Sequence, residues 1–222
     1  MATQAPGYIG LIANLPVGST LSIPDVPWEE YEQLLTDLGE SSAVRVSYDS
    51  GRLEIMSPSS KHEKRKGLIS DIGRAISNEL DCEVENFGAT TFKEKQWMQG
   101  AEPDICFYVQ NAAKVGDKEV IDLHIDPPPD IVVEIDVSRE STKKLSFYAK
   151  LGVPEIWRYD GQKMHIYGLA ENQYSQVMES RAFPFLAAEV LTRFLDECKT
   201  QSQTKTVRSF TKWLRNRLKE NH

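Results

Sequence analysis

The chain contains little cysteine, and its cysteines are not grouped. Cys82, Cys106 and Cys198 are the three cysteines among its 222 residues, and no two of them form a CxxC pair. An odd number of widely spaced cysteines argues against a disulfide framework and against a thiolate zinc site. We therefore expect reduced thiols that are mostly buried.

Long apolar runs are also missing. No stretch approaches the roughly 18 uninterrupted apolar residues that cross a bilayer. The N-terminal segment MATQAPGYIGLIANL has no Lys or Arg before its short apolar patch, so it does not resemble a secretory signal. These two absences predict a cytoplasmic protein with no membrane partner.

Several functional signatures are absent as well. The sequence has no internal repeat, which argues against solenoids and propellers. It also has no GxxxxGK loop, no HExxH motif and no discernible Ser-His-Asp arrangement. Nucleotide hydrolysis on a P-loop, zinc proteolysis and serine hydrolysis are therefore disfavoured.

Positive charge is in the minority. Lys and Arg total 26 against 33 for Asp and Glu, which gives a formal net charge of -7. This balance is unfavourable for a protein that simply coats nucleic acid, so any polyanion must meet a local basic patch. With 40% hydrophobic and 27% charged residues, the chain has an ordinary globular composition, and its length favours one domain over residues 1–222.

The spacing of apolar residues predicts a mixed α/β fold. Helical spacing occurs in residues 27–39, 61–80 and 143–151, and the tail 206–220 has the pattern of an amphipathic helix. Alternation on either side of Asp49-Ser50-Gly51 predicts a β-hairpin over 43–56. Further strands are expected at 83–87, 90–96, 104–109, 131–137, 155–159 and 163–168.

Acidic side chains follow one face of the most hydrophobic strand. In residues 131–138 the period of two places Glu134 and Asp136 on the same face. Asp104 begins an earlier strand, and the chain between the two strands is long enough to bring them side by side. Carboxylates gathered in this way repel one another unless a cation or hydrogen-bond donors compensate, and Mg²⁺ favours such oxygen ligands.

The residue pattern alone leaves other interpretations open. Glu134 and Asp136 are equally compatible with the solvent face of a half-exposed strand. For Asp104 in isolation, an acid that caps a turn after Pro103 is the more common case.

The most distinctive residues are Pro103-Asp104, the Glu-x-Asp of 134–136 and the run KLSFYAKLGVPEIW. With GRLEIMSPSSKHE (51–63) and FGATTFKEKQWMQGAEPDICFYVQN (87–111), they resemble the Uma-two family of restriction-endonuclease-like proteins. The resemblance implies a PD-(D/E)xK nuclease: a restriction-endonuclease-like mixed β-sheet core (about 43–169) flanked by helices. Residues 1–42, which precede the hairpin, and residues 170–222, which carry the amphipathic helix, would be extensions of this core.

The resemblance also implies a metal site. Asp104 would match the first acid and Glu134 the second, together holding Mg²⁺ or Mn²⁺. Asp136 stands where the signature lysine is expected and is assigned to the metal shell. Lys144, at the start of the following helix, is the candidate replacement, although an exposed helix lysine is the more common interpretation of such a residue. Glu63 would add a further metal contact, or else simply complement the dipole of its helix.

The function implied is a metal-dependent phosphodiesterase, a DNA endonuclease that activates water. The alternative is a catalytically inactive nucleic-acid-binding or interaction module on the same fold. Basic residues cluster in the second helix and in the tail, and would supply phosphate contacts if both patches flank the cleft. Homodimerisation is expected by analogy, because cutting both strands of a duplex needs two sites.

Overall fold

The computed structural model describes residues 7–39, 43–135 and 141–220, without the side chains of 141–143. These residues form two compact units. The first comprises Met1–Glu63 and Thr91–Glu102, and the second comprises Lys64–Thr90 and Pro103–His222. One domain over 1–222, with its core at about 43–169, stays a prediction.

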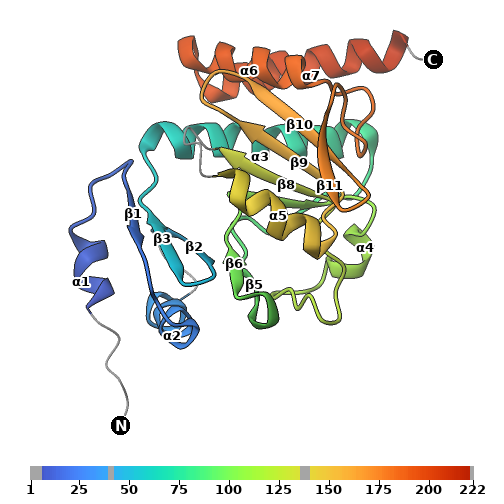
Figure 1. The fold of residues 1–222 in the computed structure, drawn as a ribbon. Coiled ribbons are helices and arrows are strands. Elements are labelled where there is room, and N and C mark those ends of the chain that lie inside the picture. Colours follow the sequence, from blue (N-terminus) through green and yellow to red (C-terminus); the bar gives the residue numbers. More distant parts are fainter. Residues whose placement is uncertain (1–6, 40–42, 136–140, 221–222) are drawn as a thin grey trace. The chain divides into compact units, whose positions relative to one another are not determined.

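The first unit is an antiparallel sheet with helices. Its strands lie in the order β1-β3-β2-β6-β5. The elements in chain order are α1 (Tyr8–Ala13), β1 (Thr20–Ile23), α2 (Trp28–Leu38), β2 (Arg45–Asp49), β3 (Arg52–Met56), β5 (Phe92–Glu94), the 3₁₀ turn η1 (Lys95–Trp97) and β6 (Gln99–Ala101), shown in Figure 1.

The predicted hairpin in this unit is confirmed. β2 and β3 pair from Arg45 with Met56 to Asp49 with Arg52. Ser50 and Gly51 between them both have positive φ, at 50° and 93°, as a two-residue hairpin turn of the I′ type requires. The predicted helix at 27–39 is α2, which buries Trp28, Tyr31 and Leu34 against this sheet.

The second unit is a six-stranded mixed sheet in the order β11-β10-β9-β8-β7-β4. β8 and β9 are parallel, and the other neighbours are antiparallel. The elements in chain order are α3 (Ser60–Leu80, whose first residues belong to the first unit), β4 (Glu85–Asn86), β7 (Ile105–Tyr108), α4 (Ala112–Val115), β8 (Ile131–Ile135), α5 (Ser141–Leu151), β9 (Glu155–Tyr159), β10 (Met164–Ala170), β11 (Gln173–Val177), α6 (Ala188–Thr200) and α7 (Gln203–Glu220).

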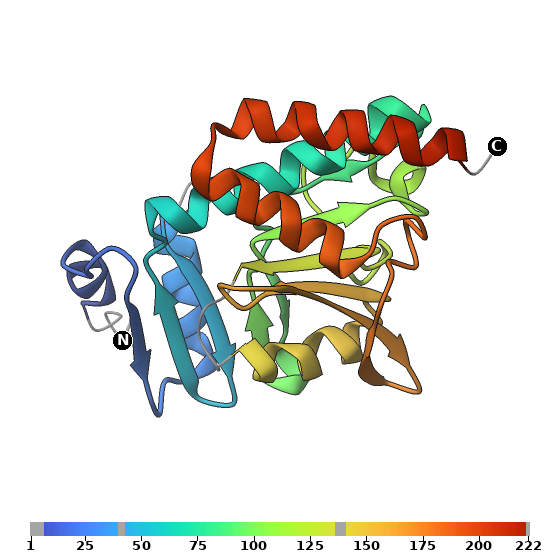
Figure 2. The same cartoon turned by 90° about the horizontal axis from the view of Figure 1, so that it is seen from above.

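The two faces of this sheet are covered differently. Ile131, Val133 and Ile135 of β8 lie in one apolar core with residues of α3, α6 and α7. The alternate residues of β8 face the side on which α5 lies, because Glu134 hydrogen-bonds to Tyr148 of α5 (Figures 1 and 2). The predicted alternation of β8 is therefore confirmed for residues 131–135.

Several elements were not predicted from the sequence. They include α1, β1, β6, α4, β11 and α6, while the strand expected at 83–87 is reduced to Glu85–Asn86. Among the described residues, no helix is long and apolar enough to cross a membrane.

Candidate active site

Asp104 and Glu134 are brought to neighbouring positions by the antiparallel pairing of β7 and β8. The pairing ends with Ile105 opposite Val133, and Asp104 and Glu134 are the adjoining residues of the two strands. Asp104 stays against β8, since its amide donates to the Val133 carbonyl at 3.1 Å. The Asp104 carboxylate is close enough to Glu134 to raise its pKa. Two carboxyl groups therefore meet on the α5 face of the sheet.

Both acids are buried. Asp104 and Glu134 are each only 3% exposed. The Asp104 carboxylate accepts a 2.7 Å hydrogen bond at Oδ2 from the backbone amide of Ile135. Because Ile135 directly follows Glu134, this hydrogen bond holds Asp104 against β8, the strand that carries Glu134.

Helix α5 supplies two donors to Glu134. The Tyr148 hydroxyl donates to Oε1 at 2.6 Å, and the Lys144 ammonium donates to Oε2 at 3.2 Å. Residues four apart on a helix share a face, so one turn of α5 presents both groups to the strand. The Lys144 side chain is 22% exposed whereas that of Glu134 is 4% exposed, so this ion pair links a buried anion to a cation at the boundary with solvent.

The electrostatics of the site follow from this burial. Burial has the largest effect on Glu134 and raises its pKa; Lys144 lowers the pKa, Asp104 raises it, and the hydrogen bond from Tyr148 lowers it. The net result is a pKa above the ordinary value of 4.5. Burial also raises the pKa of Tyr148 well above 10, and the Glu134 carboxylate adds to the shift, so Tyr148 acts as a neutral donor.

Two further polar residues, Arg158 and His165, lie on neighbouring strands in line with Glu134. The parallel register pairs Glu134 with Arg158 of β9, and the antiparallel register pairs Arg158 with His165 of β10. All three side chains therefore lie on one face. His165 contacts Asp160, with Nε2 2.9 Å from Oδ2. Arg158 was not predicted as part of the site, because its alignment with Glu134 depends on the parallel register.

Tyr148 was also not predicted as part of the site. Its signal in the sequence is the spacing of four from Lys144, which places both residues on one face of a helix. The hydrogen bond to Glu134 could not be predicted without knowing which face of α5 meets the strand.

Two predicted ligands, Asp136 and Glu63, are not described together with this group. Asp136 lies outside the described residues. Glu63 belongs to the first unit, where its carboxylate lies 3.9 Å from Arg45 and 3.4 Å from Nδ1 of His62. Their roles as metal ligands stay predictions. Over the described ranges, no three His, Cys, Asp or Glu side chains are grouped to hold a metal ion.

The basic residues of the tail do not flank these carboxylates. Phe210 and Leu214 of α7 are buried in the apolar core on the opposite face of the sheet from Glu134. In α3, Lys64 donates to the Cys198 carbonyl at 3.0 Å, and the Arg65 guanidinium lies 5.1 Å from the centre of the Tyr159 ring. The sequence predicted phosphate contacts at the active site only if both basic patches flank it, and α7 does not.

Comparison with solved structures defines the class of the fold. One of four matching chains is the crystal structure of "a putative nuclease belonging to DUF820" from Anabaena variabilis. It is 17% identical, has a TM-score of 0.50, and the match covers 77% of this chain and 99% of that chain. This likeness, with the mixed sheet flanked by helices, confirms the restriction-endonuclease-like fold.

The family follows from the sequence match. The Uma2 family model, described as "Putative restriction endonuclease", matches residues 28–193. The chain belongs to the Uma2 family. No protein of curated function matches it.

Proposed function

We propose that the protein is a divalent-metal-dependent phosphodiesterase that cleaves DNA, with Asp104, Glu134 and Lys144 in its active site. The observation that carries the proposal is the buried Glu134 carboxylate, close to that of Asp104 and 3.2 Å from the Lys144 ammonium. Membership of the Uma2 family supports nuclease chemistry.

The donor set of the site fits Mg²⁺ or Mn²⁺. Both ions favour hard oxygen ligands, and Mg²⁺ commonly binds one or two protein carboxylates while water and substrate phosphate supply the other ligands. An ionised carboxylate has about four lone-pair positions, so the hydrogen bonds described for Asp104 and Glu134 do not exhaust their capacity. Burial raises the pKa of Glu134 most and the Asp104 carboxylate raises it further, and a bound cation would oppose both effects.

A metal ion bound by Asp104 and Glu134 would supply Lewis acidity for water and for the phosphodiester. The chain's own residues then have separate tasks. Ile135 orients Asp104 through its amide, and Tyr148 holds Glu134 through its hydroxyl. Lys144 orients the attacking water and stabilises negative charge that develops on the phosphoryl oxygens.

The proposed reaction is direct hydrolysis. The water oxygen attacks phosphorus in line and loses a proton to solvent, the new P–O bond forms as the bond to the leaving oxygen breaks, and the leaving oxygen takes up a proton from solvent. No covalent enzyme intermediate is involved. Because cutting both strands of a duplex needs two such sites, the proposed working form is a homodimer.

A second candidate is a catalytically inactive nucleic-acid-binding or interaction module. The observation that favours it is Asp136, which stands two positions after Glu134 where the PD-(D/E)xK pattern has lysine. In this candidate Lys144 would serve only to balance the buried charge of Glu134.

The experiment that separates the two candidates uses supercoiled plasmid with Mg²⁺, Mn²⁺ or EDTA. The nuclease proposal predicts nicking with either metal ion and none in EDTA. Calorimetric titration of the same protein with each ion should show binding at millimolar concentration. Absence of both binding and nicking would favour the inactive module.

A further inference from the structure

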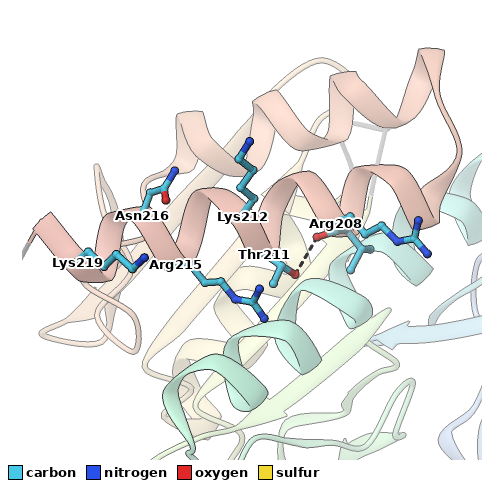
Figure 3. A pocket seen from close by; sticks show the side chains of 7 residues that line it. Arg208, Thr211, Lys212, Arg215, Asn216 and Lys219 are labelled. Carbon is cyan, nitrogen blue, oxygen red and sulfur yellow. Dashed lines mark hydrogen bonds between the residues drawn. The ribbon is translucent and has the colours of Figure 1, made fainter.

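A shallow groove runs between α3 and α7 in the second unit. One hollow of about 410 Å³ lies along α7, and a second of about 330 Å³ is lined by both helices. The two hollows share Val207, Arg208 and Thr211, so they form one continuous surface that we call the α3–α7 groove. Figure 2 shows the two helices side by side, and Figure 3 shows the α7 side of the groove.

The α7 side of the groove is strongly basic. Arg208, Lys212, Arg215 and Lys219 line it at spacings of four, three and four residues, which places them in one stripe along the helix. At 1.5 Å rise per residue, the stripe from Arg208 to Lys219 is roughly 16 Å long. Like charges at these spacings repel one another, so an anion bound to the stripe would stabilise it.

The acids of α3 neutralise only one cation of this stripe, Arg215. Asp71 accepts a 2.7 Å hydrogen bond from Gln203 and pairs with Arg74 at 3.4 Å. Glu79 is engaged by both Nε and Nη2 of Arg215, at 2.7 and 2.8 Å.

Three cations of the stripe therefore remain available. Within the described parts of the chain, no carboxylate lies at ion-pair distance from Arg208, Lys212 or Lys219. A cluster of this kind is a local exception in a protein whose formal net charge is -7.

We propose that the α3–α7 groove binds the phosphate backbone of nucleic acid. The proposal rests on the proposed function for the choice of partner, and adds a second contact surface. Since α7 packs on the opposite face of the sheet from Glu134, this surface anchors a segment of nucleic acid other than the phosphodiester at the active site.

The lining favours nucleic acid over an acidic protein partner. Protein interfaces depend on buried aromatic or aliphatic anchors, and Val207 is the one apolar side chain along the α7 hollow. Arg, Lys and the Asn216 amide are instead groups that contact phosphate and sugar. Contacts of this type carry no sequence information, so the groove should add affinity without base preference.

The test is binding of a labelled DNA duplex in EDTA, followed by fluorescence anisotropy at several salt concentrations. The groove variant carries Arg208→Gln, Lys212→Gln and Lys219→Gln. Loss of three phosphate contacts should weaken binding at low salt at least about tenfold and reduce the slope of log K against log salt by about 2.7. Circular dichroism checks that the variant is folded.

A matched control carries Arg181→Gln, Lys114→Gln and Lys163→Gln, which removes three exposed charges that lie outside α7 and do not line the groove. Its formal net charge equals that of the groove variant, so it should lose much less affinity. Equal weakening of both variants would overturn the proposal, because only overall charge would then matter. Unchanged binding by the groove variant, or equally tight binding of the wild type to polyglutamate, would also overturn it.

The same variants separate this proposal from the nuclease proposal. Binding is measured without metal and does not depend on hydrolysis. A wild-type protein that binds duplex through the groove but never nicks plasmid would refute only the nuclease proposal. Nicking with no loss of affinity in the groove variant would refute only the groove.

Discussion

The hydroxyl of Tyr148 donates a 2.6 Å hydrogen bond to Oε1 of Glu134, and both side chains are buried. Tyr148→Phe removes this donor and leaves a buried carboxylate oxygen with less compensation. We expect a loss of about 1–3 kcal/mol in the free energy of unfolding and about a tenfold loss of nicking rate. Urea denaturation and a plasmid assay measure the two effects.

Tyr174→Phe is the control for this prediction. It removes a hydrogen bond of similar length, 2.7 Å, from the Tyr174 hydroxyl to the Val153 carbonyl. A loss of about 1 kcal/mol without loss of nicking is expected. If both variants lowered nicking equally, Tyr148 would have no specific role in positioning Glu134.

Lys144 should stabilise the fold through the same carboxylate. Lys144→Gln leaves Glu134 without its cation, and we expect a loss of about 1–3 kcal/mol, less than for a fully buried pair because Lys144 reaches solvent. The exposed Lys163→Gln should be close to neutral. In a double-mutant cycle with Glu134→Gln, additive effects would show that the pair is not coupled.

The contact of α3 with the sheet predicts that alanine substitutions at two glycines of this helix differ clearly in their effect on stability. A Cβ at Gly73 would lie 2.8 Å from the Phe107 ring, whereas one at Gly67 would meet the flexible end of Gln203 at 3.1 Å. Gly73→Ala should therefore destabilise the protein by about 1–3 kcal/mol. Gly67→Ala should be neutral or stabilising by up to about 1 kcal/mol. Thermal unfolding of both variants checks the contact, and equal melting temperatures would contradict it.

The β9–β10 turn should contribute stability that depends on pH. Burial by itself raises the pKa of Asp160, but hydrogen bonds from the Lys163 amide, His165 and the Gln162 amide outweigh it and lower the pKa from 3.8 to about 2. A lowered pKa in the folded state means that the ionised form stabilises the fold. This contribution is complete above pH 3.8 and is lost as the pH falls towards 2.

Asp160→Ala tests that contribution. Because the side chain of Asp160 is partly exposed, solvent screening limits the expected loss at neutral pH to about 0.5–1 kcal/mol. The difference from wild type should shrink as the pH is lowered from 4 to 2, as long as both proteins remain folded. A difference that stays constant over this range would contradict the shifted pKa.

The strand pattern predicted much of the second unit because its signals are local. The period of two in residues 131–135 determines which residues face the apolar core, and the structure confirms that Glu134 lies on the other face. The apolar stripe of α7 is likewise confirmed, since Phe210 and Leu214 are buried.

The elements that were missed depend on longer-range or weaker signals. Strand β1 has four residues and is identified as a strand chiefly by its pairing with β3. Helix α6 is an exception, because Leu191, Phe194, Leu195 and Cys198 give it a local helical pattern that was not used to predict it. The row from Glu134 through Arg158 to His165 needs two inter-strand registers, which no local pattern supplies.

The central claim is that the Glu134 carboxylate serves hydrolysis of a phosphodiester. The most direct test compares wild type, Glu134→Gln and the exposed-acid control Glu171→Gln in plasmid nicking with Mn²⁺, after circular dichroism has shown that all three are folded. We predict that the control nicks like wild type and that Glu134→Gln is slower by at least about 100-fold. Nicking by Glu134→Gln at the wild-type rate would contradict the account.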